Sequence, residues 1–91
     1  MAIEWTGSSA RHGVDQDDAL HAMLNPLYHV SGFETSRVEG LNDPDLFIGP
    51  GRDGKLLEVM VAVEPTTRTL WVFHAMPVRP KTLAKAKEEN R

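Results

Sequence analysis

The spacing of apolar residues predicts a helix in the first third of the chain. Asp15 can cap it, because a carboxylate accepts hydrogen bonds from the free amides of a first helical turn. Asn25-Pro26 ends it, since proline has no amide hydrogen and disfavours helical geometry in the residue before it. Four apolar residues follow the i, i+3, i+4, i+7 spacing of one helix face: Leu20, Met23, Leu24 and Leu27.

The second half of the chain has the composition of β-strands. Residues 56–63 and 69–76 are rich in β-branched and aromatic side chains, with bulk on both faces, which predicts two central strands. Turn-forming residues at 49–54 and 65–68 precede these runs. We therefore expect hairpin links and antiparallel neighbours.

Shorter segments complete the expected fold. They are a strand at 3–6, a helical turn at 10–12, an edge strand at 28–35, a strand at 46–48 and a helix at 80–89. The predicted order is β-α-α-β-β-β-β-α, an α+β fold whose helices pack on one face of an antiparallel sheet. A chain of 91 residues has room for one domain, so we expect residues 1–91 to fold as a unit.

Composition and charge limit the kinds of site and of binding partner that the chain can have. The chain has no cysteine, which excludes disulfides and thiolate metal sites. Its net charge is −3, but residues 1–50 hold two Lys/Arg against eight Asp/Glu, and residues 51–91 hold eight against five. One basic face can attract phosphate in spite of the net charge, although a solvated surface explains the same asymmetry. No secretory signal or membrane-length apolar run is present, so we expect a cytoplasmic protein without membrane contact.

Five motifs of the chain follow a known family pattern: Ile3-Glu4-Trp5, Ala10-Arg11-His12-Gly13-Val14, Leu24-Asn25-Pro26-Leu27, Phe47-Ile48-Gly49 and the run from Asp53 to Val59. Together they resemble the BrnT-type toxins of bacterial toxin–antitoxin pairs. The resemblance covers most of residues 3–89 and implies a RelE-like ribonuclease fold, growth arrest by metal-independent RNA cleavage, and no cofactor. It also implies a cognate antitoxin with a ribbon–helix–helix domain, and only this antitoxin would contact DNA. An acidic segment of the antitoxin would cover the toxin's cleft.

One motif departs from this family pattern. Where the family ends its last strand with Ser-Ala-Arg, this chain has His74-Ala75-Met76. Arg79 and Lys81 can supply the missing charge a few residues later. The absent arginine favours an alternative, a non-catalytic protein-interaction module on the same scaffold. A nucleic-acid-binding regulator is a third hypothesis, which the net negative charge and the few aromatic residues disfavour.

Seven residues are candidates for the chemistry of RNA cleavage. The reaction needs a base for the 2′-hydroxyl proton, cations for the phosphate and an acid for the leaving 5′-oxygen. The four histidines lack the close spacing of zinc ligands, so we expect no metal site. The candidate catalytic residues are His12, Glu58, His74 and Arg79, and the candidate phosphate-binding residues are Arg11, Arg52 and Lys81.

The two candidate histidines also have structural explanations. His12 lies beside a glycine that can present it at the surface, but it can equally close the turn by bonding a loop carbonyl. His74 stands at the end of a strand, where a cleft can reach it. Strand alternation otherwise makes it a core histidine on the same face as Leu70, Val72 and Met76.

Glu58 interrupts the longest apolar run of the chain. A carboxylate in a central strand must either find a partner or shift its pKa upward. It can therefore serve as a general base, or it can form a buried ion pair with Arg52, Arg68 or Arg79.

Overall fold

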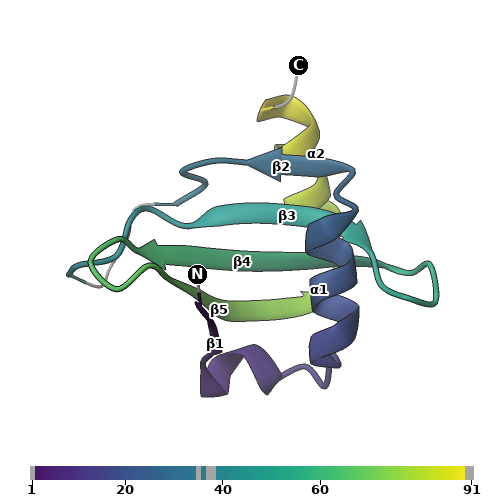
Figure 1. Ribbon diagram of the computed structural model, residues 1–91. Helices are drawn as coiled ribbons and strands as arrows, with labels where there is room; N and C mark the ends of the chain where they lie inside the picture. Colours follow the sequence, from purple (N-terminus) through teal and green to yellow (C-terminus); the bar gives the residue numbers. More distant parts are fainter. Residues whose placement is uncertain (1, 35, 37–38, 90–91) are drawn as a thin grey trace.

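The computed structural model describes residues 2–34, 36 and 39–89, which form one sheet with helices packed against it (Figure 1). The predicted combination of a sheet with helices is confirmed. Within the described residues, no helix is long and apolar enough to cross a membrane. The elements in chain order are β1 (Ala2–Trp5), the 3-10 helix η1 (Gly7–Ala10), α1 (Gln16–Leu24), β2 (Tyr28–Val30), β3 (Asp45–Pro50), β4 (Leu56–Glu64), β5 (Thr69–Pro77) and α2 (Pro80–Glu89).

Several element boundaries differ from the predicted ones. The first helical turn is the 3-10 helix η1, which precedes the α-turn expected at 10–12. The expected edge strand at 28–35 ends at Val30, and residue 35 lies outside the described residues. β3 continues through Pro50, which pairs with the first residue of β4, so the turn between these strands is shorter than predicted. Asp15 caps α1 as predicted, accepting a hydrogen bond of 2.8 Å from the amide of Asp17.

The five strands lie in the order β1-β5-β4-β3-β2. The pairs β2–β3, β3–β4 and β4–β5 are antiparallel, in agreement with the predicted hairpin links. β1 is parallel to β5, so the sheet is mixed and the prediction of a wholly antiparallel sheet is wrong. These two strands lie at opposite ends of the sequence, so no hairpin fixes their relative direction. Between them, η1 and α1 carry the chain from the β1 edge to β2 at the other edge.

The two α-helices cover opposite faces of the sheet. Val59 and Val61 of β4 pack in one apolar cluster with Ala22 of α1. Met60, which lies between them, packs in a second cluster with Ala86 of α2. The prediction that the helices share one face is therefore wrong. The physical reason is that β4 is apolar on both faces, and burying both requires cover on both sides.

α1 approaches β3 closely through small residues. Ala19 and Ala22 are fully buried, whereas Leu24 and Leu27 of the predicted apolar stripe are 80% and 61% exposed. A Cβ atom on Gly49 would lie 2.9 Å from the carbonyl oxygen of the helix C-cap and would also meet that of Ala22. Because only glycine permits this close backbone approach, the alanine side of the helix faces the sheet. Of the predicted stripe, Met23 packs against the core, whereas Leu24 and Leu27 do not, so helical spacing identified the contact face only in part.

Candidate active site

Glu58 lies in the middle of the sheet and has no solvent-exposed surface. Its side chain is on the face that α2 covers, where it receives four hydrogen bonds. Oε1 accepts from the backbone amide of Arg79 at 2.9 Å and from Arg79 Nε at 3.0 Å. Oε2 accepts from Arg79 Nη2 at 2.7 Å and lies 2.8 Å from His74 Nε2. Of the three arginines considered as partners, Arg79 is the one that pairs with this carboxylate.

The ionisation of Glu58 is determined by two opposing effects. Burial raises the pKa of its carboxyl, while hydrogen bonds from the side chain and backbone of Arg79 and from His74 lower it. The hydrogen bonds dominate, so the pKa lies below the ordinary value of 4.5 and the carboxylate is charged at neutral pH. A carboxylate that is fully hydrogen-bonded and hard to protonate is poorly suited to act as a general base. Its chemistry is to hold the groups that donate to it.

A β-bulge in β5 places His74 on the same side of the sheet as Glu58. Met60 of β4 pairs with His74, but the next residue, Val61, pairs with Val72, so Phe73 is an extra residue on β5. Val72 packs on the α1 side, whereas Phe73 packs on the α2 side with Met60. The prediction that His74 shares a face with Val72 is wrong, because the bulge reverses the alternation between the two residues.

His74 combines one satisfied ring nitrogen with access to solvent. Its Nε2 faces the Glu58 carboxylate, which can only accept, so the proton of the neutral ring belongs on Nε2. Nδ1 then carries the lone pair that can take a proton. The side chain is 21% exposed, so a ligand can reach it from outside. The ring is bonded to a buried carboxylate, as expected of a core histidine. It is also partly exposed, as expected of a residue that a cleft can reach.

His12 lies beside His74, although the two residues are far apart in the sequence. The chain reaches this position along the free edge of β5, where the Thr6 amide donates to the Val72 carbonyl and Ser8 Oγ donates to the Phe73 carbonyl. The His12 and His74 ring centroids are 6.0 Å apart, with the ring planes at 69°. His12 is exposed, so the two imidazoles meet at a surface where a ligand can touch both.

Arg79 brings a guanidinium back to the sheet from the start of α2. Glu58 is the register partner of Met76, the position where the resemblance leads one to expect arginine. Arginine has five N–H groups, and two of them, one on Nε and one on Nη2, bond Glu58, which leaves three. The side chain is 51% exposed, so these remaining donors can face a ligand.

Further cations lie close to Arg79 and to His12. A cleft of about 280 Å³ beside Arg79 is lined by Lys81 and Lys85 as well as by polar and apolar groups. Lys85 Nζ lies 4.7 Å from the centre of the Phe33 ring. Arg11 is exposed and directly precedes His12. Arg11 is therefore adjacent to His12, and Lys81 shares a cleft with Arg79.

Arg52 is not part of this group. It binds carboxylates at the start of α1, with Nε 2.8 Å from Asp18 and Nη2 3.4 Å from Asp15. Hydrogen bonding to Asp18 raises the pKa of Arg52, and the same contact lowers the pKa of Asp18. Asp17 lies 3.8 Å away, so three carboxylates already surround this cation. The positions of Arg52 and of the three aspartates in the sequence did not indicate that they would pair.

The other two histidines have structural contacts. His21 Nδ1 lies 2.7 Å from the Pro50 carbonyl oxygen and links α1 to the end of β3. His29 lies 3.1 Å from Asp45 and stacks on Phe47. Across the part of the chain that the structure describes, no three His, Cys, Asp or Glu side chains gather as a metal site would require.

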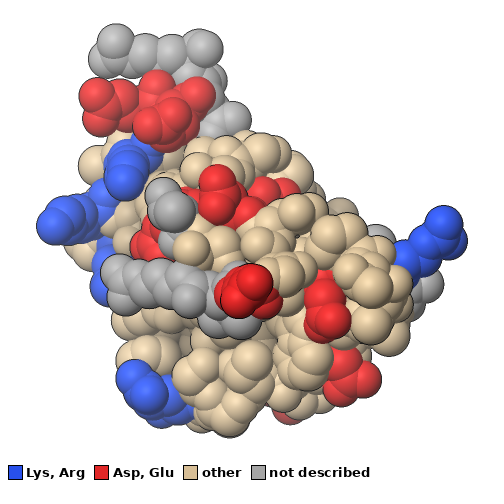
Figure 2. All heavy atoms as spheres, turned by 90° about the vertical axis from the view of Figure 1, so that its left-hand side faces the viewer, with Lys and Arg blue, Asp and Glu red and all other residues tan. Residues whose placement is uncertain are grey.

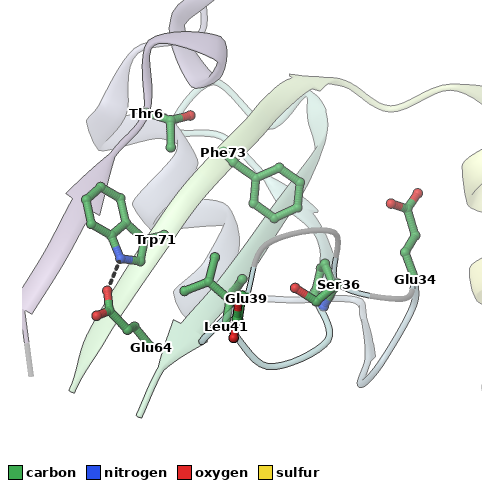
Figure 3. Close-up of a pocket in the computed structure, with 10 residues that line it drawn as sticks. Thr6, Glu34, Ser36, Glu39, Leu41, Glu64, Trp71 and Phe73 are labelled. Carbon is green, nitrogen blue, oxygen red and sulfur yellow. Dashed lines mark hydrogen bonds between the residues drawn. The ribbon is translucent and has the colours of Figure 1, made fainter. Parts of the chain in front are cut away.

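A second cavity, which the sequence did not predict, is lined in part by Phe73, the residue before His74. It has a volume of about 610 Å³ and is bordered by Trp71 and Phe73 of β5 and by Glu64 of β4 (Figure 3). The sequence contained one indication of this cavity. Trp71 and Phe73 are two positions apart, which places both rings on one side of the strand. What sequence reasoning lacked was the position of Glu34, Ser36, Glu39, Leu41 and Pro44, which lie between β2 and β3 and also line the cavity.

Comparison of the chain with protein-family models, with curated proteins and with solved structures gives no match. The candidate site therefore stands on its own geometry, which joins His12, Glu58, His74 and Arg79 from four separate segments.

Proposed function

We propose that this chain is a metal-independent endoribonuclease and the toxin of a bacterial type II toxin–antitoxin pair. The observation that carries the proposal is the histidine pair: His74 is oriented by a buried, charged Glu58, and the His12 ring lies 6.0 Å from it. Glu58 also holds Arg79 beside the same opening. Two imidazoles and a guanidinium are the groups that metal-free phosphodiester cleavage requires.

The roles follow from the proton positions. His74 Nδ1 takes the proton from the 2′-hydroxyl, and the 2′-oxygen attacks phosphorus to form a pentavalent phosphorane. Glu58 stabilises the imidazolium that this transfer creates, as a buried carboxylate does in a serine protease triad. Protonated His12 gives its proton to the leaving 5′-oxygen as the P–O5′ bond breaks. The products are a 2′,3′-cyclic phosphate and a free 5′-hydroxyl.

The cations serve the phosphate. The three remaining N–H groups of Arg79 can donate to its non-bridging oxygens, where negative charge grows during the reaction. Lys81 lines the Arg79 cleft and Arg11 precedes His12, so each can bind a neighbouring phosphate of the strand. Arg52 has no role in this proposal, because the carboxylates of α1 occupy it.

The toxin role rests on the sequence resemblance. It implies that RNA cleavage in the cytoplasm blocks translation and that a cognate antitoxin, through a ribbon–helix–helix domain, also contacts DNA. An antitoxin segment carrying carboxylates has the charge to cover Arg79, Lys81 and Lys85. Such a segment would exclude RNA from the histidine pair.

One observation favours the alternative of a non-catalytic interaction module. Every hydrogen bond that Glu58 can readily accept is satisfied within the chain, as expected of a structural ion pair. In that case His74 and Arg79 stabilise the sheet, and the surface around them binds a protein.

A cleavage assay separates the two. The purified chain is incubated, with EDTA present, with a labelled RNA and with the same RNA carrying 2′-deoxy substitutions, alone and with ribosomes. The proposal expects cleavage of the unmodified RNA only, with 2′,3′-cyclic phosphate ends. Cleavage of the deoxy RNA would rule out 2′-hydroxyl attack. Failure to cleave in both settings would leave the interaction module as the better explanation.

A further inference from the structure

The second cavity has apolar walls. Trp71 and Phe73 of β5 line it together with Leu41, which belongs to the segment between β2 and β3 (Figure 3). Ala62 of β4 also lines this space. Half-buried apolar walls of this kind accept hydrocarbon groups, and the faces of indole and phenyl rings attract cations.

The polar groups of the cavity are mainly acidic. Glu34, Glu39 and Glu64 line it, and none of the described lining residues is Lys or Arg. Glu64 is held in place by Trp71, whose Nε1–H donates to its Oε1 at 3.1 Å. Figure 2 shows this end of the molecule, with carboxylates on the central surface and Lys and Arg toward the margins. A nucleic acid backbone is repelled by such a surface, whereas a cationic group is attracted.

We propose that this cavity binds a segment of a partner protein in which a lysine or arginine lies beside an apolar residue. The apolar side chain and the aliphatic stem of the cation fill the space against Trp71 and Phe73. The charged group pairs with Glu39 and Glu64. This assignment goes beyond the ribonuclease proposal and does not depend on it.

The cavity lies next to the candidate active site, so a segment bound in it can also cover that site. Phe73 precedes His74 directly, and Glu34 borders both this cavity and the cleft that contains Arg79 and Lys81. A segment anchored in the cavity and continuing past Glu34 therefore reaches the cleft of Arg79, which binds the same Glu58 oxygen as His74. Its charge must change along its length, from basic at the cavity to acidic at Arg79.

Selection from a random dodecapeptide display library tests this. The full chain is the target, and the enriched peptides are synthesised and titrated calorimetrically. The site variant is Glu39→Gln/Glu64→Gln, which keeps the shape and an acceptor for the Trp71 indole. The control is Glu88→Gln/Glu89→Gln, which removes the same charge from α2. We expect enriched peptides to carry Lys or Arg beside an apolar residue. Their affinity should fall about tenfold or more for the site variant and less than about twofold for the control.

Three results would overturn the proposal. They are the absence of enriched peptides, enrichment of peptides without a cation, and equal binding to the site variant and to the wild type. Displacement of the peptide by an uncharged nucleoside such as guanosine would also overturn it, in favour of a nucleobase site. A His12→Ala variant, which keeps every donor to Glu58, should bind the peptide as the wild type does. Loss of RNA cleavage and loss of peptide binding are therefore separate results.

Discussion

Among the described residues, Arg79 binds a carboxylate at the centre of the sheet and Arg52 binds carboxylates at the start of α1, and these two clusters differ in burial. Glu58 has no exposed surface and receives four hydrogen bonds from Arg79 and His74. At the start of α1, Arg52 and Asp17 have side chains that are 54% and 72% exposed. The residue types are the same, but solvent screens the second cluster and hardly reaches the carboxylate of the first.

Burial turns the first cluster into a positioning device. A desolvated carboxylate must keep its donors, because losing one leaves a buried charge without compensation. Glu58 therefore fixes the orientation of His74 and Arg79 more strictly than any surface contact can. The exposed cluster can exchange its partners for water at little cost. Variants of the two clusters should accordingly differ in activity, stability and response to pH.

The largest expected effect is on RNA cleavage. Removing a general acid or base typically costs about 10²–10⁴-fold in rate. We expect His74→Ala and His12→Ala each to lower kcat by about 10³-fold, and Arg52→Ala to change it by less than about twofold. Single-turnover cleavage of a labelled RNA measures this. Equal losses in the Arg52 and His74 variants would mean that the working site lies elsewhere.

The next effect is on stability. Glu58→Gln keeps the shape of the side chain but removes the charge that Arg79 and His74 bind. Breaking a buried ion pair costs about 3–5 kcal/mol, and since Arg79 is half exposed we expect about 3 kcal/mol for this variant. Asp18→Asn in the exposed cluster should shift the urea midpoint far less. Urea unfolding curves of the three proteins test the contrast, and similar midpoints for both variants would refute it.

Sequence reasoning identified the members of the buried cluster but not its geometry. Glu58 interrupts an apolar run, so its carboxylate was expected to need a partner. Arg79 was one of the three arginines named as possible partners. The bulge at Phe73 was not predictable, because strand alternation assumes a regular strand. The close contact at Gly49 also changed which side of α1 is buried. The cavity beside Trp71 depends on how a loop packs, which local sequence patterns do not encode.

The shape of the guanidinium should matter in one cluster only. Arg79 binds Glu58 through Nε and Nη2 together, and a lysine has no planar fork to do this while also reaching a phosphate. We expect Arg79→Lys to lower cleavage by about tenfold and Arg52→Lys to leave it unchanged. Equal activity of Arg79→Lys and the wild type would mean that a point charge is sufficient at this position.

The smallest expected difference between the clusters is in how their contributions to stability depend on pH and salt. Glu58 and Asp18 both have folded pKa values below their ordinary ones, so below about pH 5 the unfolded chain binds more protons than the folded chain. The stability that each group provides is therefore complete above its unfolded pKa and is lost as the pH falls through its folded pKa. Comparing the wild type with Glu58→Gln and Asp18→Asn across this range isolates each contribution.

Salt then separates the two, because about 1 M NaCl screens exposed charges over about 3 Å but does not enter the core. The acid-sensitive difference between the wild type and Glu58→Gln should persist in that salt, and the difference for Asp18→Asn should shrink. A Glu58 contribution that salt abolished would mean that water reaches this carboxylate in solution. His74 would then lack a fixed orientation, and the assignment of His74 as the base would fail with it.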